Sequence, residues 1–386
     1  MHVLLAPDKF KGSLRASEVA AALAAGLRDA APEVETVTVP VADGGDGTLD
    51  AAVSAGYRHV PITVTGPTGD RVDTGYAVRD GVAVVELADA CGLNRLPGGV
   101  LAPLTASSTG FGELIAAALD AGCHRVILGI GGSASTDGGA GMLVALGARL
   151  LNVDGEELPA GGAALEHIDR VDLGGLHRAA GGAEFVLASD VDNPLLGPTG
   201  AAAVYGPQKG ATPDDVARLD GALQHWSRSL ARAMGVDGGP SGHPAADVPG
   251  AGAAGGVGFA ALAVLHAEAR PGIDLLLELT GFYQQLTDAQ LVITGEGSLD
   301  TQTLHGKAPA GVAAAARRAG VPVIAVAGRN LLSVTELTAA GIGGAYALLD
   351  IEPDPGRCMT HAAPLLRKTA GLIARDWLTQ QVGQRP

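Results

Sequence analysis

The chain begins with MHVLLAPDKFKGSLRASEVAAALAAGL (residues 1–27), an apolar strand followed by a helix. His2–Ala6 is a compact apolar run, and Ala16–Leu27 places apolar residues at helical spacing. The alternation continues with an expected strand at Thr36–Val41 and an expected helix at Thr48–Ala55. Strands separated by single helices indicate βαβ units and a parallel sheet.

The same alternation returns near the other end of the chain. We expect strands at Leu291–Thr294, Val323–Ala327 and Ala345–Leu349, and helices at Ala310–Ala319 and Val334–Ala340. Because both ends carry this pattern, we predict one discontinuous α/β domain formed by residues 1–62 and 288–386. Its parallel sheet is expected to be of the Rossmann or flavodoxin-like kind.

The middle of the chain differs and is predicted to be a second α/β domain, inserted at residues 63–287. Strands without helices between them are expected at Val60–Val64, Asp73–Val78 and Val82–Glu86. Helices are expected at Phe111–Ala121, Gly138–Leu146 and Pro213–Met234, strands at Arg125–Gly129 and Glu184–Ala188, and a loop at Gly235–Gly258. A chain of 386 residues exceeds the usual size of one core, so we expect two domains with the functional site in the cleft between them.

Charge and cysteine content exclude several classes of function. A net charge of −15 with 26 lysines and arginines disfavours binding to nucleic acid or to an anionic membrane surface. Cys91, Cys123 and Cys358 have neither the spacing of a zinc site nor that of a disulfide framework, and no unbroken apolar run of about 20 residues occurs. We therefore expect a soluble cytoplasmic protein, monomeric or homodimeric, that binds neither nucleic acid nor membrane.

Glycine-dense segments that carry acids, hydroxyls or a lysine follow several of the expected strands. They are DGGDGT (43–48), GGSASTDGG (131–139), PQKG (207–210) and TGEGSLD (294–300). Glycine lets backbone N–H groups approach a ligand, carboxylates hold divalent cations, and lysine neutralises phosphate. The segments together indicate phosphoryl transfer.

Two candidate groups lie near the N-terminus. Lys9, Lys11 and Ser13 open the first helix, where an anion would be stabilised, although a capped helix with solvated lysines is an alternative. Asp43 and Asp46 occupy a glycine turn after the second strand. They could bind a metal-bridged phosphate or substrate hydroxyls, or they could belong to a turn before an N-capped helix.

Two more groups lie in the middle segment. Ser133 and Ser135 sit in a glycine loop that could cradle a phosphate or nucleotide, or be a structural turn. Asp190 and Asn193 follow a strand and offer oxygen ligands for Mg²⁺ or for a hydroxyl substrate. An Asx turn would use the same two residues.

The C-terminal segment is the most informative. Glu296 and Asp300 could share a metal ion or act on a hydroxyl, and Lys307 could neutralise phosphate. Gln208 and Lys209 offer a donor and a cation on a separate loop, although a solvated loop lysine also fits that position.

In this order the motifs resemble those of the type I glycerate kinases. The resemblance rests on APDKFKGSL (6–14), ADGGDGT (42–48), GGSA (131–134), SDV (189–191) with NPL (193–195), GPQKGAT (206–212), PGAGAAGG (249–256), and TGEG (294–297) with LD (299–300), QT (302–303) and GK (306–307). It extends from about residue 3 to about residue 350. Several long motifs in one order are far more specific than any single motif.

The resemblance implies ATP-dependent phosphorylation of D-glycerate, with 2-phosphoglycerate as the usual product beside ADP. With the chemistry of phosphoryl transfer, in which positioning and charge neutralisation dominate, it gives each candidate a role. The expected catalytic residues are Asp190, Asp43, Lys9 and Lys307. The expected substrate or phosphate ligands are Lys11, Ser13, Asp46, Ser133, Ser135, Asn193, Gln208 and Lys209. The expected ligands of Mg²⁺ on the ATP phosphates are Asp190, Glu296 and Asp300.

The chain departs from the family pattern at three positions. Members of this family commonly carry Glu, Asn and Arg where this chain has Asp46, Thr136 and Ser298, which concerns substrate affinity more than reaction type. Two alternatives stay open at this point. One is a kinase of the same scaffold that acts on another small hydroxy acid, and the other is a noncatalytic binding protein for a phosphorylated acid.

Overall fold

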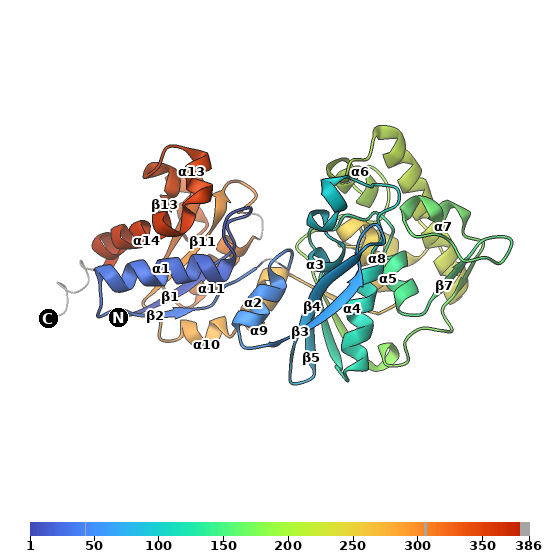
Figure 1. Cartoon of the computed structure of the whole chain (residues 1–386), viewed down its shortest axis with the longest axis horizontal. Coiled ribbons are helices and arrows are strands. Elements are labelled where there is room, and N and C mark those ends of the chain that lie inside the picture. The colour runs from blue at the N-terminus through green and yellow to red at the C-terminus, as the bar shows by residue number, and fades with distance from the viewer. Residues whose placement is uncertain (43, 305–306, 379–386) are drawn as a thin grey trace. The chain divides into compact units, whose positions relative to one another are not determined.

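The computed structural model describes residues 1–42, 44–304 and 307–378 (Figure 1). The chain divides into two compact units. The described residues of 1–43, 50–56 and 273–386 form one, here called the terminal unit, and those of 44–49 and 57–272 form the other, the inserted unit. The expected fold class is confirmed: one α/β domain is built from both chain ends, and a second α/β domain is inserted into it.

The terminal unit contains a five-stranded sheet in which every strand pair is parallel. The strand order is β13-β12-β11-β1-β2. The strands are β1 (His2–Pro7), β2 (Glu35–Thr38), β11 (Leu291–Leu299), β12 (Val323–Asn330) and β13 (Ala345–Ala347). Because β1 lies between β2 and β11, Val3 is aligned with Leu291 and Pro7 with Gly295.

Helices cover both faces of this sheet. Leu4 and Ala6 of β1 pack with α9 (Gly272–Leu279), α10 (Phe282–Leu286), α11 (Ala308–Arg318) and α12 (Val334–Ala339). Val3 and Leu5 pack with α1 (Ala16–Ala30), α13 (Pro355–Thr360) and α14 (Ala362–Ile373), which continues as a π-helical turn at Ala374–Leu378. Successive side chains of a strand point to opposite faces, so a strand buried on both faces is apolar along its length.

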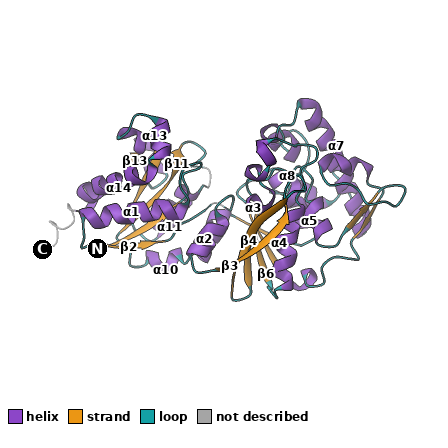
Figure 2. Ribbon diagram, in the orientation of Figure 1, coloured by secondary structure: helices purple, strands orange, loops and turns teal. Residues whose placement is uncertain are grey.

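The inserted unit has a six-stranded mixed sheet of order β10-β9-β6-β5-β4-β3, whose strands Figure 2 draws in orange. The strands are β3 (Arg58–Thr65), β4 (Arg71–Arg79), β5 (Val82–Glu86), β6 (Arg125–Gly129), β9 (Glu184–Ala188) and β10 (Glu268–Arg270), with a separate ribbon of β7 (Arg149–Leu151) and β8 (Arg170–Asp172). β3, β4 and β5 pair antiparallel, whereas β5, β6, β9 and β10 pair parallel. The helices are α3 (Leu87–Cys91), α4 (Thr109–Asp120), α5 (Ala140–Ala145), α6 (Ala201–Tyr205), α7 (Pro213–Met234) and α8 (Ala253–Ala263), and α2 (Thr48–Ser54) begins in this unit and ends in the other.

The unit boundaries fall after residues 56 and 272, not after 62 and 287. β3 pairs with β4 along its whole length, from Arg58 to Thr65, so it belongs to the inserted sheet. Ile273 and Phe282 pack in the core of the terminal unit, so the chain returns to that unit earlier than the strand pattern indicated.

The expectation of a loop over Gly235–Gly258 is wrong in its last part, where α8 begins. The backbone there has positive φ at Ala254 (54°), Gly255 (69°) and Gly256 (91°). A Cβ on Gly255 would approach the carbonyl oxygen of Ser135 to 2.1 Å. Glycine therefore lets a left-handed turn pack directly against the glycine loop at 131–139.

Two further features of the described residues are the state of the cysteines and the length of the helices. Cys91, Cys123 and Cys358 are buried free thiols. Burial raises the pKa of Cys91 to about 12, so its thiol stays protonated and unreactive. Within the described ranges, no helix has the length and apolar character needed to cross a bilayer.

Candidate functional site

The first cluster of charges lies at the carboxyl ends of β1 and β11 in the terminal unit. Pro7 and Gly295 are aligned neighbours there, and the N–H of Asp8 donates to the carbonyl oxygen of Gly295 (2.8 Å). β1 ends at Pro7, so Lys9 follows its end, whereas β11 continues to Leu299 and Glu296 is the β11 residue after Gly295, aligned with Ala327 of β12.

Glu296 and Lys307 face one another in this cluster. Lys307 Nζ lies 3.8 Å from Glu296 Oε2, with 35% of the lysine side chain exposed and 10% of the glutamate side chain. The buried hydroxyl of Thr303 donates to Glu296 Oε1. Lys307 also precedes α11 as its N-cap residue, so the pair stands at the positive end of that helix. This arrangement presents both signs of charge to a ligand.

A second loose pair lies beside it. Lys9 Nζ is 3.8 Å from Asp8 Oδ1, and the N–H of Lys9 donates to the same oxygen (2.6 Å). Lys11 is exposed, whereas the hydroxyl of Ser13 donates to the carbonyl oxygen of Met359 (2.6 Å). The structure thus places two lysines at the strand edge but engages Ser13 in a contact within the fold.

Asp300 is held in a local turn. Its Oδ1 accepts the N–H of Gln302 (2.9 Å), and its own N–H donates to Thr303 Oγ1 (3.0 Å). These are the bonds of the turn that leads from β11 toward Lys307. Asp43, expected to act in catalysis, lies outside the described residues.

In the inserted unit, the turn at residues 44–49 lies over the carboxyl ends of β5, β6 and β9. A Cβ on Gly44 would lie 3.0 Å from the carbonyl oxygen of Ala188, and one on Gly131 would lie 2.5 Å from Gly45. The turn carries Asp46, which is partly buried. The DGGDGT and GGSASTDGG motifs are therefore in contact, which the sequence analysis did not foresee.

Lys209 is the cation of the second cluster, and it is enclosed. Only 2% of the residue is exposed, and its Nζ donates to Ser133 Oγ (2.8 Å) and to the carbonyl oxygen of Ser135 (2.5 Å). Burial lowers the pKa of Lys209 to about 7, against a smaller opposing effect of Asp137. The three predicted residues Ser133, Ser135 and Lys209 are thus brought together, but the lysine holds the loop from inside.

Two hydroxyls next to this lysine are buried without a partner. Ser135 Oγ and Thr136 Oγ1 make no hydrogen bond within the described part of the chain. Buried polar atoms are almost always hydrogen-bonded, so an orphaned pair in one loop marks a place where a ligand or water completes the structure.

Asp137, which the sequence analysis did not select, anchors the same loop. Its side chain is buried and accepts the N–H of Ser108 (2.8 Å) and of Gly141 (3.2 Å) through Oδ2, and that of Gly139 (3.2 Å) through Oδ1. The hydroxyl of Ser108 donates to it as well (2.8 Å). The signal available in the sequence was an acid between a hydroxyl run and a glycine pair, where backbone N–H groups of the loop need an acceptor.

The remaining predicted residues lie on surface segments of the inserted unit. Asp190 is exposed, and its Oδ1 accepts the N–H of Gly272 (2.9 Å). The side chain of Asn193 donates to the carbonyl oxygen of Thr199 (2.8 Å) and accepts from the hydroxyl of Tyr205 (2.5 Å). Gln208 is exposed. Both the nitrogen and the oxygen of the Asn193 side chain therefore already form hydrogen bonds within the fold. Asp190 lies at the carboxyl end of β9 and is exposed there.

The predicted metal ligands are divided between the units, since Glu296 and Asp300 belong to the terminal unit and Asp190 to the inserted one. Among the described residues, no group of three or more His, Cys, Asp or Glu side chains could hold a metal ion. A site built from protein ligands alone is thus not present in that part of the chain.

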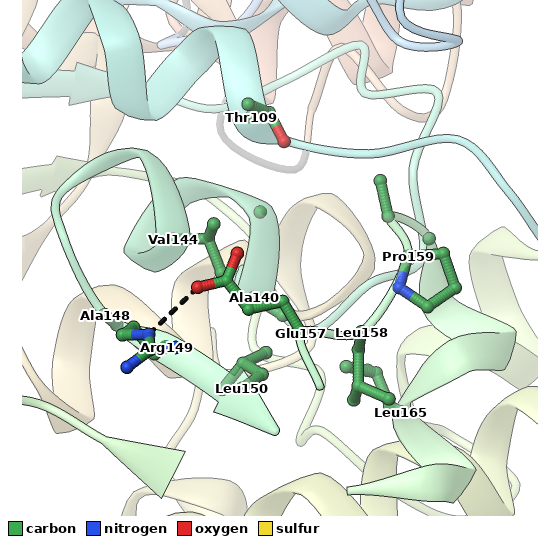
Figure 3. A pocket seen from close by; sticks show the side chains of 13 residues that line it. Thr109, Ala140, Val144, Ala148, Arg149, Leu150, Glu157, Leu158, Pro159 and Leu165 are labelled. Atoms are coloured by element: carbon green, nitrogen blue, oxygen red, sulfur yellow. Dashed lines mark hydrogen bonds and ion pairs between the residues drawn. The ribbon is translucent and has the colours of Figure 1, made fainter. Parts of the chain in front are cut away.

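An apolar pocket lies behind the Asp137 network (Figure 3). Its walls include Leu150, Leu158 and Leu165, and its charged feature is the ion pair of Arg149 with Glu157 (2.9 Å). Gly141 lines the pocket and also donates to Asp137. With its only cation paired, this pocket is unsuited to phosphate.

The chain is similar to known proteins over nearly its whole length. A model of the glycerate kinase family matches residues 3–378. The chain is 43% identical over 377 residues to a glycerate kinase of Bacillus subtilis, covering 97% of each chain. It is 42% identical over 354 residues to a glycerate 2-kinase of Escherichia coli, covering 90% of this chain and 91% of the other. A crystal structure from Salmonella typhimurium, provisionally named glycerate kinase 2, has a TM-score of 0.83 and 42% identity, covering 100% of this chain and 99% of that one.

Proposed function

Because this chain belongs to the glycerate kinase family, we propose that it transfers the γ-phosphoryl group of ATP to D-glycerate, giving 2-phosphoglycerate and ADP. Membership makes it a kinase, a phosphotransferase with an alcohol group as acceptor, for which ATP is the phosphate donor. The observation that carries the finer proposal is the pair of Glu296 with Lys307, in which Glu296 follows the Gly295 that is aligned with the end of β1, where Lys9 lies.

The terminal-unit cluster suits the triphosphate. Phosphoryl transfer asks for positioning and charge neutralisation, and Lys9, Lys11 and Lys307 supply positive charge near one sheet edge. The Glu296–Lys307 distance of 3.8 Å is long for a hydrogen bond, so the lysine can turn toward phosphate at small cost.

Magnesium fits this cluster as a partner of ATP. Mg²⁺ bound to a nucleotide needs only one or two carboxylates, because phosphate oxygens and water complete its shell. In the proposal Glu296 holds the ion, with Asp300 of the same unit as a further candidate. When bound, the ion would neutralise charge on the transferred group.

The inserted unit is proposed to bind the acceptor. Asp190 would orient or deprotonate the glycerate hydroxyl, with Asp43 as second choice, and Asp46 would contact substrate. The orphaned hydroxyls of Ser135 and Thr136 support a ligand at the glycine loop. Lys209 would act by fixing that loop, since its Nζ is enclosed. A cytoplasmic location belongs to the same proposal and rests on the free cysteines.

A ³¹P NMR spectrum of the product formed from D-glycerate and ATP tests the proposal. We expect a new phosphoester resonance at the position of 2-phosphoglycerate, because the two phosphoglycerate isomers are distinguishable. A resonance of 3-phosphoglycerate would overturn the product assignment. A coupled assay of ADP release with glycerate, lactate, tartronate and glycolate identifies the acceptor, and faster turnover of another acid would overturn the substrate.

A further inference from the structure

Glu86 is a buried carboxyl group that no motif includes. It ends β5, only 1% of the residue is exposed, and each of its oxygens accepts one backbone N–H. Oε1 accepts from Gly47 (3.0 Å) and Oε2 from Leu49 (2.8 Å). Both donors lie on the turn at residues 44–49 that carries Asp46.

The turn held by Glu86 also packs on the end of β6 and on the loop that follows. A Cβ on Gly129 would lie 3.2 Å from the carbonyl oxygen of Gly44 and from Thr48, and one on Gly131 would lie 2.5 Å from Gly45. The position of the turn is thus fixed on one side by glycine contacts and on the other by the two oxygens of Glu86.

Stability alone does not explain a carboxylate at this position. In the described part of the chain, no lysine, arginine or histidine forms an ion pair with Glu86, and burying a charge without a cation is costly. An ionised carboxylate is purely an acceptor, so it can receive both N–H groups, whereas an amide or a protonated carboxyl group offers one acceptor and one donor.

We propose that Glu86 is a positioning residue whose carboxylate holds the Asp46 turn (residues 44–49) against the glycine loop at 131–139. This inference rests on the proposed function insofar as Asp46 is a substrate ligand. The placement of the turn itself is independent of the reaction. Loss of one of the two bonds lets the turn move, which raises KM for the acceptor more than it lowers kcat.

The ionisation of Glu86 gives the proposal a signature in pH. Burial, followed by the negative charges of Asp89 on α3 and Asp46 on the turn, raises the pKa of Glu86 to about 8. As pH rises through this value, the second acceptor forms and the turn is held by two bonds in place of one. Glu86→Gln keeps one acceptor at every pH and so resembles the protonated wild type.

Hydrogen exchange of the full-length protein between pH 6 and pH 9 tests this directly. In the wild type, protection of the peptide covering residues 44–49, corrected for intrinsic rates, should rise about fivefold above pH 8, as expected for one added hydrogen bond. In Glu86→Gln it should stay at the low value. The matched control is Glu113→Gln, because Glu113 also accepts a backbone N–H and a hydroxyl, both from Thr65, away from this turn.

Steady-state ADP release at pH 9 supplies the second readout. Glu86→Gln should raise KM for the acceptor about fivefold with kcat changed less than twofold, and Glu113→Gln should change neither. Protection that does not depend on pH in the wild type overturns the proposal and needs no variant. Equal losses in both variants also overturn it, since they indicate a general structural role. Absence of ADP from the wild type contradicts the proposed function and leaves the exchange test intact.

Discussion

Lys307 in the terminal unit and Lys209 in the inserted unit are both lysines of glycine-containing segments, yet their surroundings are opposite. Lys307 stands 3.8 Å from Glu296 with 35% of its side chain exposed. Lys209 is 2% exposed and donates over 2.8 and 2.5 Å to the loop around it. A lysine in a glycine-containing segment can therefore either present its charge to a ligand or hydrogen-bond a loop of the fold. The burial of its Nζ determines which of the two it does.

The two arrangements differ in energy as well. A loose, partly exposed pair contributes little to stability, in the range of about 0–1 kcal/mol, and its charges remain available to a ligand. A buried hydrogen-bonded network is costly to break, because each orphaned group loses its solvation. Substitutions in the loose Glu296–Lys307 pair should therefore affect catalysis, and substitutions in the buried network of Lys209 and Asp137 should affect the fold.

The largest effect is expected for Glu296→Gln, which keeps the shape of the side chain but removes its charge. If Glu296 holds the metal on ATP, kcat/KM for ADP release should fall about 100-fold or more, with the melting temperature nearly unchanged. Thr303→Val is the control, since it removes the hydroxyl that donates to Glu296 and accepts the N–H of Asp300 but leaves the carboxylate of Glu296 in place. A decrease in kcat/KM no larger than that of Thr303→Val would show that the charge of Glu296 is not needed for turnover, and that the loose pair does not differ from the buried network in this way.

Asp137→Asn tests the expectation that the buried network of the inserted unit stabilises the fold. Asp137 accepts three backbone N–H groups and a hydroxyl, so replacing one oxygen by a donor should lower the free energy of unfolding by about 2–3 kcal/mol. Denaturant unfolding followed by circular dichroism measures this. Asp172→Asn, at an exposed acceptor of one N–H, should cost far less. Similar values for both variants would contradict a buried network.

Lys307→Met should reduce kcat/KM about tenfold, because one positive charge near the phosphates is lost. Lys368→Met on α14 removes the same charge from an exposed site of the same unit and should leave turnover unchanged. Measuring KM for ATP in both variants separates phosphate binding from a general effect of net charge. Equal KM values would remove Lys307 from the site.

The effect that is smallest within any one pH unit is a dependence of stability on pH. The pKa of Lys209 is lowered to about 7 by burial. Between about pH 7 and the ordinary lysine value the unfolded chain binds a proton that the folded chain does not, so wild-type stability should rise with pH. The slope is at most about 1.4 kcal/mol per pH unit. Lys209→Met should lack this rise, and unfolding curves from pH 6 to pH 10 compare the two.

Much of the fold was accessible from the sequence, because its signals are local. Pro213–Met234 was predicted with the bounds of α7, and Thr212 caps it by accepting the N–H of Asp215. β5, β6 and β9 likewise have the predicted bounds. Apolar alternation, a capping hydroxyl and a proline at N1 are readable without partners.

The rest depended on contacts that no local pattern encodes. Lys209 was expected to bind phosphate, but its Nζ is enclosed by Ser133, Ser135 and Gly255, which are all distant from it in sequence. Glu86 was missed because its partners are backbone amides of another segment, and Asp137 because Ser108, which donates to it twice, is distant in sequence. In the sequence, a carboxylate beside a glycine loop looks the same whether its side chain contacts a ligand or a turn that is distant in sequence.

The position of β1 between β2 and β11 has a consequence for how the protein folds during its synthesis. β1 pairs with β11, and Thr294 bonds to Ala6 across 288 positions of sequence. During synthesis on the ribosome, the inserted unit can fold before β11 has been made. β1 and β2 are then present without the strand that pairs with the other edge of β1. Closing so long a loop is slow, and during that interval the edge of β1 is open to pairing with other chains.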